Sequence, residues 1–383
     1  MKRKRVVAIA PYSRPWSNVE LIKDCGLIPY LLYREHSCDS VMVCSTPDAD
    51  ALPPSIYDSC DEDILSVYFP YYHLVSGEKF EFLPDGSVET KQQYIINYAN
   101  DIDILILRGV YADNLTLPYI YKTLNPRGKI YCGLDMNTSW MRKIDWTNGA
   151  IVSYMDNTDL LATSCTRTAE LMTSELPWDI KCIPNGSYNF NAKFNEYVDF
   201  DKRENIIITV GRLGTIQKAT DILLLAFAIA SPSLPSWKLE LIGNVEESFM
   251  PVVNQIFSAF PDLREKVVFT GPINDSTALA REYRRAKIFA LTSVLEGGTP
   301  NAAADAVSAG LATCITDIDA SSDITDYGRC GLVSPIDDYE AFARSLITLC
   351  QSHELKQYSE HAYSYGKTFY NMSRIVNTIY DQL

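Results

Sequence analysis

The sequence predicts an α/β protein made of two doubly wound domains. Short apolar runs alternate with segments of helical periodicity along the whole chain, and 383 residues are too many for one ordinary core. Continuous apolar strands separated by helices are typical of parallel sheets that are covered on both faces. Ligands bind such sheets beyond the carboxyl ends of the strands, so the residues that follow each strand matter most.

The first half of the chain alternates in this way. A helix is predicted for 17–26, between a first strand and a further apolar run that is interpreted as a strand. The predicted strands are 5–11, 27–35, 101–110, 128–135 and 159–164. The basic residues 1–5 are expected to be a solvated lead-in, because the apolar run that follows them before Pro11 is too short for a signal peptide.

The second half repeats the pattern more regularly. The predicted strands are 205–213, 237–244, 266–273, 287–293 and 311–318, and the predicted helices are 219–231, 246–260, 276–286 and 300–310. A polar, turn-rich segment precedes them. We therefore expect an N-terminal domain over 1–190, a linker over 191–204, a C-terminal domain over 205–350, and helices over 351–383 that pack back on the first domain.

Composition narrows the class of protein. The chain is 47% hydrophobic and 21% charged, with a net charge of −14, which suits a globular protein and opposes binding to nucleic acid. Ten cysteines occur without CxxC pairs, so we expect reduced thiols and no zinc site. No segment is long and apolar enough to span a bilayer. These features predict a cytoplasmic protein with at most peripheral contact with a membrane.

The loop after the strand at 205–213 carries two cations. Gly211 allows a tight turn, and Arg212 and Lys218 flank a loop that leads into a helix. Two cations beside a helix N-terminus suit a diphosphate. Two solvated surface cations are the alternative interpretation. Asn244 follows a strand that ends in glycine, where a ligand would find room.

The stretch LEGGTPNAAADAVSAG, residues 295–310, follows another strand. Glu296 should project from the strand end, and the turn at Gly297 and Gly298 clears space beside it. A helix is expected to begin at Thr299 as N-cap and Pro300 as N1, so that its first N–H groups, near Asn301, could bind phosphate. Asp305, in the second turn, could accept hydrogen bonds from vicinal hydroxyls or could simply be solvated.

Several motifs together resemble a known family. IPNG (183–186), VGRL (210–213), QKATDILLLAFA (217–228), LIGN (241–244), VVFTGPI (267–273), TSVLEGGTPNAAADAVSAG (292–310) and CITDIDASSDI (314–324) look like the nucleotide-binding half of the retaining GT-B glycosyltransferases of family four, also called glycosyl transferases group 1. The resemblance implies the GT-B fold, in which two Rossmann-like domains face a central cleft. It covers about 183–338.

The resemblance also implies roles for the residues named above. Arg212 and Lys218 would bind the donor diphosphate, and Glu296 would lie beside the donor sugar. The family's second Glu, on the ribose hydroxyls, should fall eight positions later, at Ala304. A shift of one residue moves that role to Asp305. The other donor-binding candidates are Gly211, Asn244, Gly297, Gly298, Thr299, Pro300 and Asn301.

The first half is less typical of the family. The loop after its first strand, APYSRPWSNVE, lacks glycine, and Leu134 stands where many members have a histidine. Ser13, Arg108 and Asp135 are the candidates for the cleft or the acceptor. Plain alternatives are open for each: a connecting loop for Ser13, an ion pair for Arg108 and a helix N-cap for Asp135.

These interpretations lead to one expected function. The chain is expected to be a retaining, metal-independent glycosyltransferase that uses a nucleoside-diphosphate sugar as donor and needs no cofactor. The acceptor would be a glycan or a lipid-linked hydroxyl, in glycan or polysaccharide biosynthesis. No conventional nucleophile is evident, which agrees with a front-face displacement. A nucleotide-sugar epimerase and a non-catalytic sugar- or nucleotide-binding subunit are the alternatives.

Overall fold

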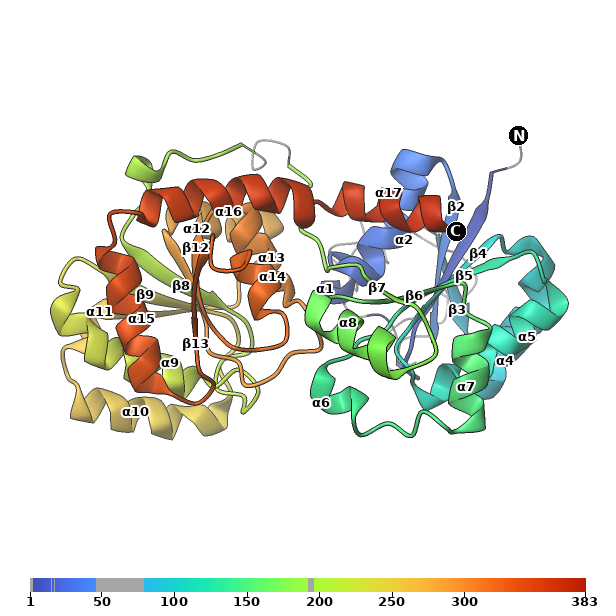
Figure 1. The fold of residues 1–383 in the computed structure, drawn as a ribbon, viewed down its shortest axis with the longest axis horizontal. Coiled ribbons are helices and arrows are strands. Elements are labelled where there is room, and N and C mark those ends of the chain that lie inside the picture. Colours follow the sequence, from blue (N-terminus) through green and yellow to red (C-terminus); the bar gives the residue numbers. More distant parts are fainter. Residues whose placement is uncertain (1–2, 15, 17, 46–78, 192–195) are drawn as a thin grey trace. The chain divides into compact units, whose positions relative to one another are not determined.

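A computed structural model describes residues 3–14, 16, 18–45, 79–191 and 196–383 of the chain. The chain divides into two compact units (Figure 1). Unit 1 comprises 1–185 and 372–383, and unit 2 comprises 186–371. Each unit is an α/β domain with one parallel sheet, as the sequence predicts.

Unit 1 has a seven-stranded parallel sheet in the order β3-β2-β1-β4-β5-β6-β7. The strands are β1 (Arg5–Ile9), β2 (Asp39–Ser45), β3 (Lys79–Leu83), β4 (Ile104–Arg108), β5 (Lys129–Gly133), β6 (Leu160–Thr163) and β7 (Ile180–Cys182). In the centre, Val7 of β1 lies opposite Leu105 of β4. The four residues from Ile104 to Leu107 are all buried, which explains why this strand is a continuous apolar run.

The helices of unit 1 lie between these strands. They are α1 (Asn18–Leu21), α2 (Asp24–His36), α4 (Val88–Tyr98), α5 (Leu117–Leu124), α6 (Thr138–Met141), α7 (Gly149–Asp156), α8 (Thr166–Glu175) and α17 (Met372–Gln382). The predicted strand at 27–35 is wrong, because these residues belong to α2. Six consecutive residues from Leu27 to Leu32 are buried, and a short apolar run of this kind looks the same in a buried helix and in a buried strand.

Unit 2 has a six-stranded parallel sheet in the order β10-β9-β8-β11-β12-β13. The strands are β8 (Ile206–Val210), β9 (Lys238–Ile242), β10 (Val267–Gly271), β11 (Ile288–Leu291), β12 (Ala312–Thr316) and β13 (Gly331–Ser334). The helices are α9 (Thr220–Ala230), α10 (Met250–Ala259), α11 (Leu263–Lys266), α12 (Ser276–Arg285), α13 (Asn301–Ser308), α14 (Ser321–Thr325), α15 (Tyr339–Gln351) and α16 (Leu355–Phe369). Helices α9 and α15 pack together, as do α13 and α16 (Figure 1).

The division between the units differs from the predicted boundaries. It falls between Asn185 and Gly186, whereas the sequence placed a linker at 191–204. Residues 200–202 of that segment form a short 3-10 helix, and Arg203 beside it is buried in unit 2. Its guanidinium donates to the carbonyls of Ala286, at 3.0 Å, and Ala309, at 2.6 Å. Of the helices expected to pack back on the first domain, α17 belongs to unit 1, where it packs on α2, and α16 belongs to unit 2.

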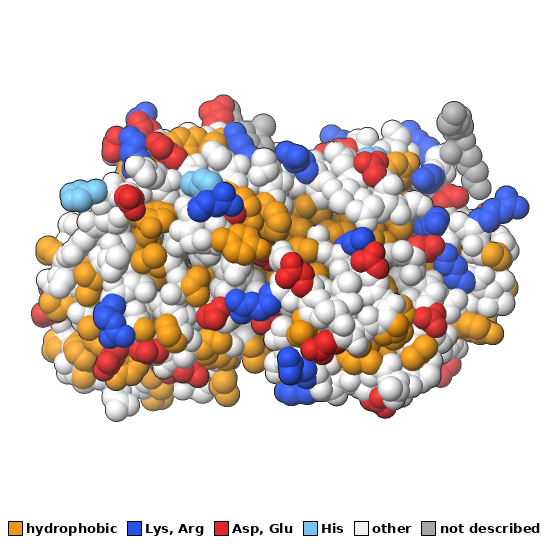
Figure 2. Space-filling view, viewed as in Figure 1, with side chains coloured by type: hydrophobic (Ala, Val, Ile, Leu, Met, Phe, Trp, Pro, Cys, Tyr) orange, Lys and Arg blue, Asp and Glu red, His pale blue; other side chains and the backbone are white. Residues whose placement is uncertain are grey.

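The surface is consistent with the composition. Figure 2 shows acidic and basic side chains interspersed on the visible face of each unit, without an extended basic area among the described residues. Every cysteine that the structure describes is a free thiol, and most are buried. A search of the described helices finds none with the length and apolar character needed to cross a membrane.

Lys91 of α4 is buried in unit 1 and gives a test of the fold. Its side chain is 1% exposed, and its Nζ lies 3.8 Å from Asp113 and 3.5 Å from Asn114 Oδ1. Burial lowers the pKa of the ammonium, and Asp113 opposes that shift. The folded state therefore carries the cost of a charged Lys91 at pH 7, and its stability rises with pH between the lowered pKa and the ordinary value near 10.4.

We expect Lys91→Met to raise the free energy of unfolding by about 1 kcal/mol at pH 7, because it keeps the volume and removes the buried charge, while Asp113 is 33% exposed and can stay hydrated without its partner. The gain should be smaller at pH 10 than at pH 7, because the lowered pKa lets the wild-type side chain lose its proton more readily as pH rises. Urea denaturation at both pH values measures this. Lys129→Met is the control, since Lys129 is 44% exposed and only its surface pair with Asp159 is lost. A destabilised Lys91→Met at pH 7 would contradict the prediction.

Candidate functional site

The candidate site lies where the strand order of unit 2 reverses. Strands β8 and β11 are neighbours in the sheet but are separated by two strands in the chain, so the crossover connections diverge between them. Gly211 and Arg212 directly follow β8, and the segment from Thr292 to Glu296 directly follows β11. A doubly wound sheet binds its ligands at this point.

Close packing of two loops shapes the floor of the site. Gly211 donates to the carbonyl of Ile242 at 3.0 Å, and Leu213 donates to the carbonyl of Asn244 at 2.8 Å. Gly243 has a φ of +142°, and a Cβ there would lie 1.8 Å from the Gly211 oxygen. Only glycine fits such a backbone approach. The LIGN motif therefore holds the loop after β8 in place, and its Asn244 is exposed.

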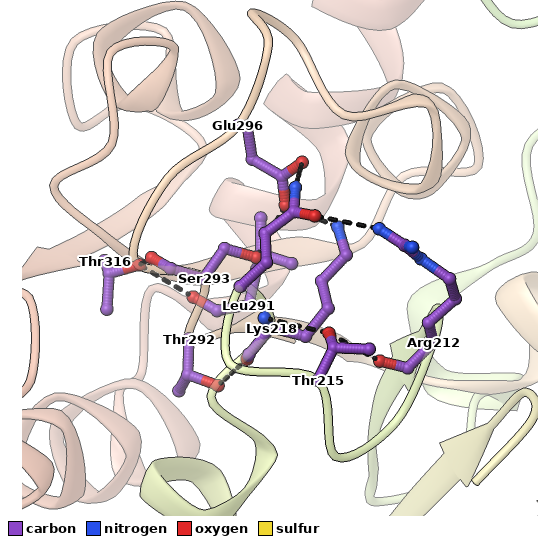
Figure 3. Close-up of polar contacts among 9 residues, drawn as sticks. Arg212, Thr215, Lys218, Leu291, Thr292, Ser293, Glu296 and Thr316 are labelled. Carbon is purple, nitrogen blue, oxygen red and sulfur yellow. Dashed lines mark hydrogen bonds and ion pairs between the residues drawn. The ribbon is translucent and has the colours of Figure 1, made fainter. Parts of the chain in front are cut away.

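Three of the predicted residues meet in this site. The ammonium of Lys218 donates to Oε1 of Glu296, and the Ser293 hydroxyl donates to the same oxygen at 2.6 Å. The carboxylate is 9% exposed and the lysine 17%. Figure 3 shows the side chains of Arg212 and Lys218 both extending toward Glu296. The structure thus brings the two cations and the first carboxylate together.

Gln217 links these residues and is absent from the sequence prediction. Its Oε1 accepts from Nη2 of Arg212 at 2.8 Å, and its Nε2 donates to Oε2 of Glu296 at 3.0 Å. The Gln217 amide thus bridges Arg212 and Glu296 by two hydrogen bonds. In the sequence, Gln217 is the first residue of the QKATDILLLAFA motif (217–228), beside Lys218 in a loop at a strand end, and no separate role was predicted for it.

Hydroxyl groups around the site fix its backbone. Thr292 Oγ1 donates to the carbonyl of Ala219 at 2.9 Å. Thr316 Oγ1 donates to the carbonyl of Ser293 at 2.6 Å (Figure 3). Ala219 has a φ of +42°, which is strained for a residue with a Cβ, so the bond from Thr292 holds an unfavourable conformation. A small pocket opens beside the loop, lined by residues that include Gly211, Arg212, Lys218 and Thr292.

The stretch 295–310 forms the expected turn and helix with one shift. Helix α13 begins at Asn301 with Pro300 as its N-cap, so the predicted N-cap at Thr299 is wrong by one residue. Thr299 is buried, and Gly298 has a φ of +126°, which favours glycine. At the other end, Leu311 donates to the Ala306 carbonyl at 3.0 Å, and Gly310 has a φ of +79°. This Schellman motif ends the helix at the glycine that the sequence singled out.

The interaction described for Asp305 lies outside the cluster around Glu296. It lies in the second turn of α13, half-buried, while the preceding Ala304 is fully buried. Its charge acts on Tyr283 of α12, where burial first and Asp305 second raise the pKa of the phenol. Contact with a ribose therefore stays a prediction for Asp305.

The three candidates of unit 1 all have a charged side chain as a neighbour. Arg108, at the end of β4, pairs with Asp24 and lies 3.5 Å from Asp135. Burial raises the pKa of Asp135, and Arg108 opposes the shift. Ser13 donates to Asp113 at 3.0 Å. The ion-pair interpretation of Arg108 is confirmed, and Asp135 is not a helix N-cap, since Asn137 caps α6.

A second cluster in unit 2 contains potential metal ligands. The ligand atoms of Asp326, Cys330 and His361 lie within 4.8 Å of one another. Asp326 already accepts from Arg329 at 2.5 Å, and its other oxygen lies 2.6 Å from Nε2 of His361. Burial raises the pKa of the Cys330 thiol to about 12. The group is accounted for as an ion-pair cluster, and we assign no metal to it.

Comparison with known proteins agrees with this geometry. Residues 204–352 match the family described as glycosyl transferases group 1. No curated protein matches the chain by sequence.

Solved structures match over nearly the whole length. Sucrose-phosphate synthase from Thermosynechococcus elongatus has a TM-score of 0.70 at 14% identity, covering 99% of this chain and 98% of that one. HepE of Anabaena, in complex with UDP and glucose, has a TM-score of 0.69 at 13% identity, covering 99% of both chains. A glycosyltransferase from Rickettsia africae has a TM-score of 0.69 at 11% identity, covering 100% and 98%. These likenesses establish the fold as GT-B, as the resemblance implied.

Proposed function

We propose that this protein is a retaining glycosyltransferase, because residues 204–352 match the family described as glycosyl transferases group 1. It would move a sugar from a nucleoside-diphosphate donor to a hydroxyl of an acceptor. The observation that carries the proposal is the convergence of Arg212, Lys218 and Glu296 at the switch point of unit 2. Two cations and one carboxylate there match the charges of a diphosphate and the polarity of a sugar.

The cations would act on the leaving group. When the bond between the anomeric carbon and the diphosphate oxygen breaks, negative charge grows on that oxygen. Arg212 and Lys218 would stabilise it from fixed positions, which costs no reorganisation during the reaction. They would supply the positive charge that a divalent ion supplies in other sugar transferases, so we propose that transfer needs no metal.

Glu296 would act on the sugar. Its carboxylate is held by Lys218, Ser293 and Gln217, and it would accept hydrogen bonds from sugar hydroxyls as the ring takes on oxocarbenium character. The acceptor oxygen would bond to the anomeric carbon from the face that the diphosphate leaves, and its proton would pass to the departing diphosphate oxygen. No bond to the protein forms, and the anomeric configuration is retained.

Other features support finer parts of the proposal. HepE structures contain UDP or UDP-glucose, which makes a uridine donor the first to test. The backbone from Gly297 to Asn301 and the loop at Gly211 and Asn244 would surround the donor, with Asp305 on the ribose. On unit 1, Ser13, Arg108 and Asp135 would lie toward a glycan or lipid-linked acceptor. We place the enzyme in glycan or polysaccharide biosynthesis, in the cytoplasm and at most peripheral to the membrane.

Proton NMR of donor turnover tests the proposal. The protein is incubated with UDP-, GDP- and ADP-sugars, with and without EDTA, and the released nucleotide and sugar are followed. We expect one donor to release its nucleoside diphosphate and a sugar that first appears with the anomeric configuration of the donor, unaffected by EDTA. Release of nucleotide with a 2-epimer would indicate an epimerase. Binding without any turnover of a donor, across a panel of acceptors, would indicate a non-catalytic subunit.

A further inference from the structure

Gln217 connects the two strand ends that form the candidate donor site. It lies in the loop after β8, and its backbone oxygen accepts from the N–H of Val294 at 2.9 Å, in the segment after β11. Its side chain joins the same two segments a second time, between Arg212 and Glu296. The residue thus connects the two strand ends through both backbone and side chain.

The charges on either side determine how the amide is oriented. A guanidinium only donates hydrogen bonds, and an ionised carboxylate only accepts them. If the amide were flipped, its NH2 would face the donors of Arg212 and its oxygen would face the oxygen of Glu296, so both hydrogen bonds would be lost. An ionised glutamate cannot donate to Glu296, and a lysine cannot accept from Arg212. An amide satisfies both neighbours at once.

We propose that Gln217 is a positioning residue that keeps the guanidinium of Arg212 and the carboxylate of Glu296 apart and oriented for the donor. This inference rests on the proposed function of the site. Opposite charges without the amide between them would be free to form a direct ion pair. Such a pair would turn Arg212 away from the diphosphate and take lone pairs of Glu296 away from the sugar. Gln217 would therefore act through these two residues without touching the reacting atoms.

Two substitutions separate positioning from a merely structural role. In Gln217→Ala the amide is gone, and we expect kcat for donor turnover to fall roughly 10- to 100-fold, in line with misplaced catalytic groups, while the unfolding midpoint changes little. In Gln217→Glu the introduced carboxylate would attract Arg212 and repel Glu296. We expect a larger loss of kcat than in Gln217→Ala at pH 8.

The pH profile of Gln217→Glu is the decisive readout. A protonated carboxyl has one donor and one acceptor, as the amide does. The Glu296 charge favours its protonation and the charges of Arg212 and Lys218 oppose it, so the carboxyl gains its proton only as pH falls. Activity relative to wild type should therefore recover as pH falls from 8 to about 5. Gln93→Ala and Gln93→Glu are the matched controls, since the Gln93 amide is exposed and bonds to Asn97 on α4. These controls should retain wild-type kcat at every pH.

Two results would overturn the inference. One is a Gln217→Glu enzyme whose kcat and pH profile match wild type. The other is a crystal structure of Gln217→Ala in which Arg212 and Glu296 keep their places, because the proposal expects them to approach within 4 Å of each other. The crystal structure needs no donor. A wild-type protein that binds and turns over no donor would instead refute the proposed function, so the two failures are distinguishable.

Discussion

Replacing Glu296 with glutamine is expected to lower kcat for sugar transfer by about 10²-fold or more. The carboxylate accepts from Lys218, Ser293 and Gln217, so these three donors are arranged around an anion. The amide would present an NH2 group to one or more of these donors and would leave the Lys218 ammonium without its counter-charge. Both effects move the group that is proposed to hold the sugar hydroxyls. Initial rates of nucleotide release at saturating donor measure the change.

Loss of stability has to be separated from loss of catalysis. Glu240 on β9 offers a matched control, because its side chain is 9% exposed, as that of Glu296 is, and it pairs with Arg285 at 2.6 Å. Glu240→Gln and Glu296→Gln should each cost about 2 kcal/mol of unfolding free energy. Only Glu296→Gln should lose activity. Equal activities of the two folded variants would contradict the assigned role of Glu296.

Replacing Arg108 with methionine is expected to have the largest effect on stability, about 3–5 kcal/mol. Arg108 is the positive centre of a partly buried group, and its partner Asp24 has a side chain that is only 8% exposed. Methionine fills much of the volume but leaves the Asp24 carboxylate buried beside the negatively charged Asp135. Arg108 also opposes the burial that raises the pKa of Asp135, so its removal raises that pKa further.

The loss of stability in Arg108→Met should depend on pH through the raised pKa of Asp135. An acid whose folded pKa is raised destabilises the folded state as pH rises from its unfolded value, near 3.9, through the raised value. The cost of Arg108→Met should therefore be greatest at pH 7 and smaller at pH 4, measured by urea denaturation. Arg14→Met is the control, because Arg14 is 50% exposed and pairs with Glu20 at the surface. A double variant with Asp24→Asn should recover part of the loss, and no recovery would contradict the account.

Much of the fold could be predicted from the sequence because both sheets are parallel. Strands such as β8 and β11 are buried on both faces and therefore stand out as continuous apolar runs. The end of α13 could also be predicted, because a Schellman motif requires a residue such as Gly310. The helical structure of residues 27–35 could not be predicted, because Leu27–Leu32 are buried in helix α2 and carry no polar face that would mark the helical period. Helix α13 begins one residue later than predicted, and its N-cap residue makes no side-chain hydrogen bond.

The site residues that directly follow the ends of strands could be predicted from the sequence. Arg212, Lys218 and Glu296 each follow a strand at the switch point, so topology brings them together. Gln217 and Asp24 were missed because their roles depend on partners 79 and 84 residues away, at Glu296 and Arg108. Spacing in the chain carries no information on contacts of that kind.

The most direct test of the central claim is nucleoside-diphosphate binding at the loop that carries Arg212 and Lys218. Thermal unfolding is followed with UDP, GDP or ADP at up to millimolar concentration, for the wild type and for Arg212→Met. A ligand at 100 times its Kd should stabilise the wild type by about 2.7 kcal/mol, and the variant should need far more of the same nucleotide for an equal shift. Stabilisation of the wild type by one nucleotide, weakened in Arg212→Met, is the predicted result. No shift with any nucleotide, or an equal shift in both proteins, would contradict the assignment of the donor site.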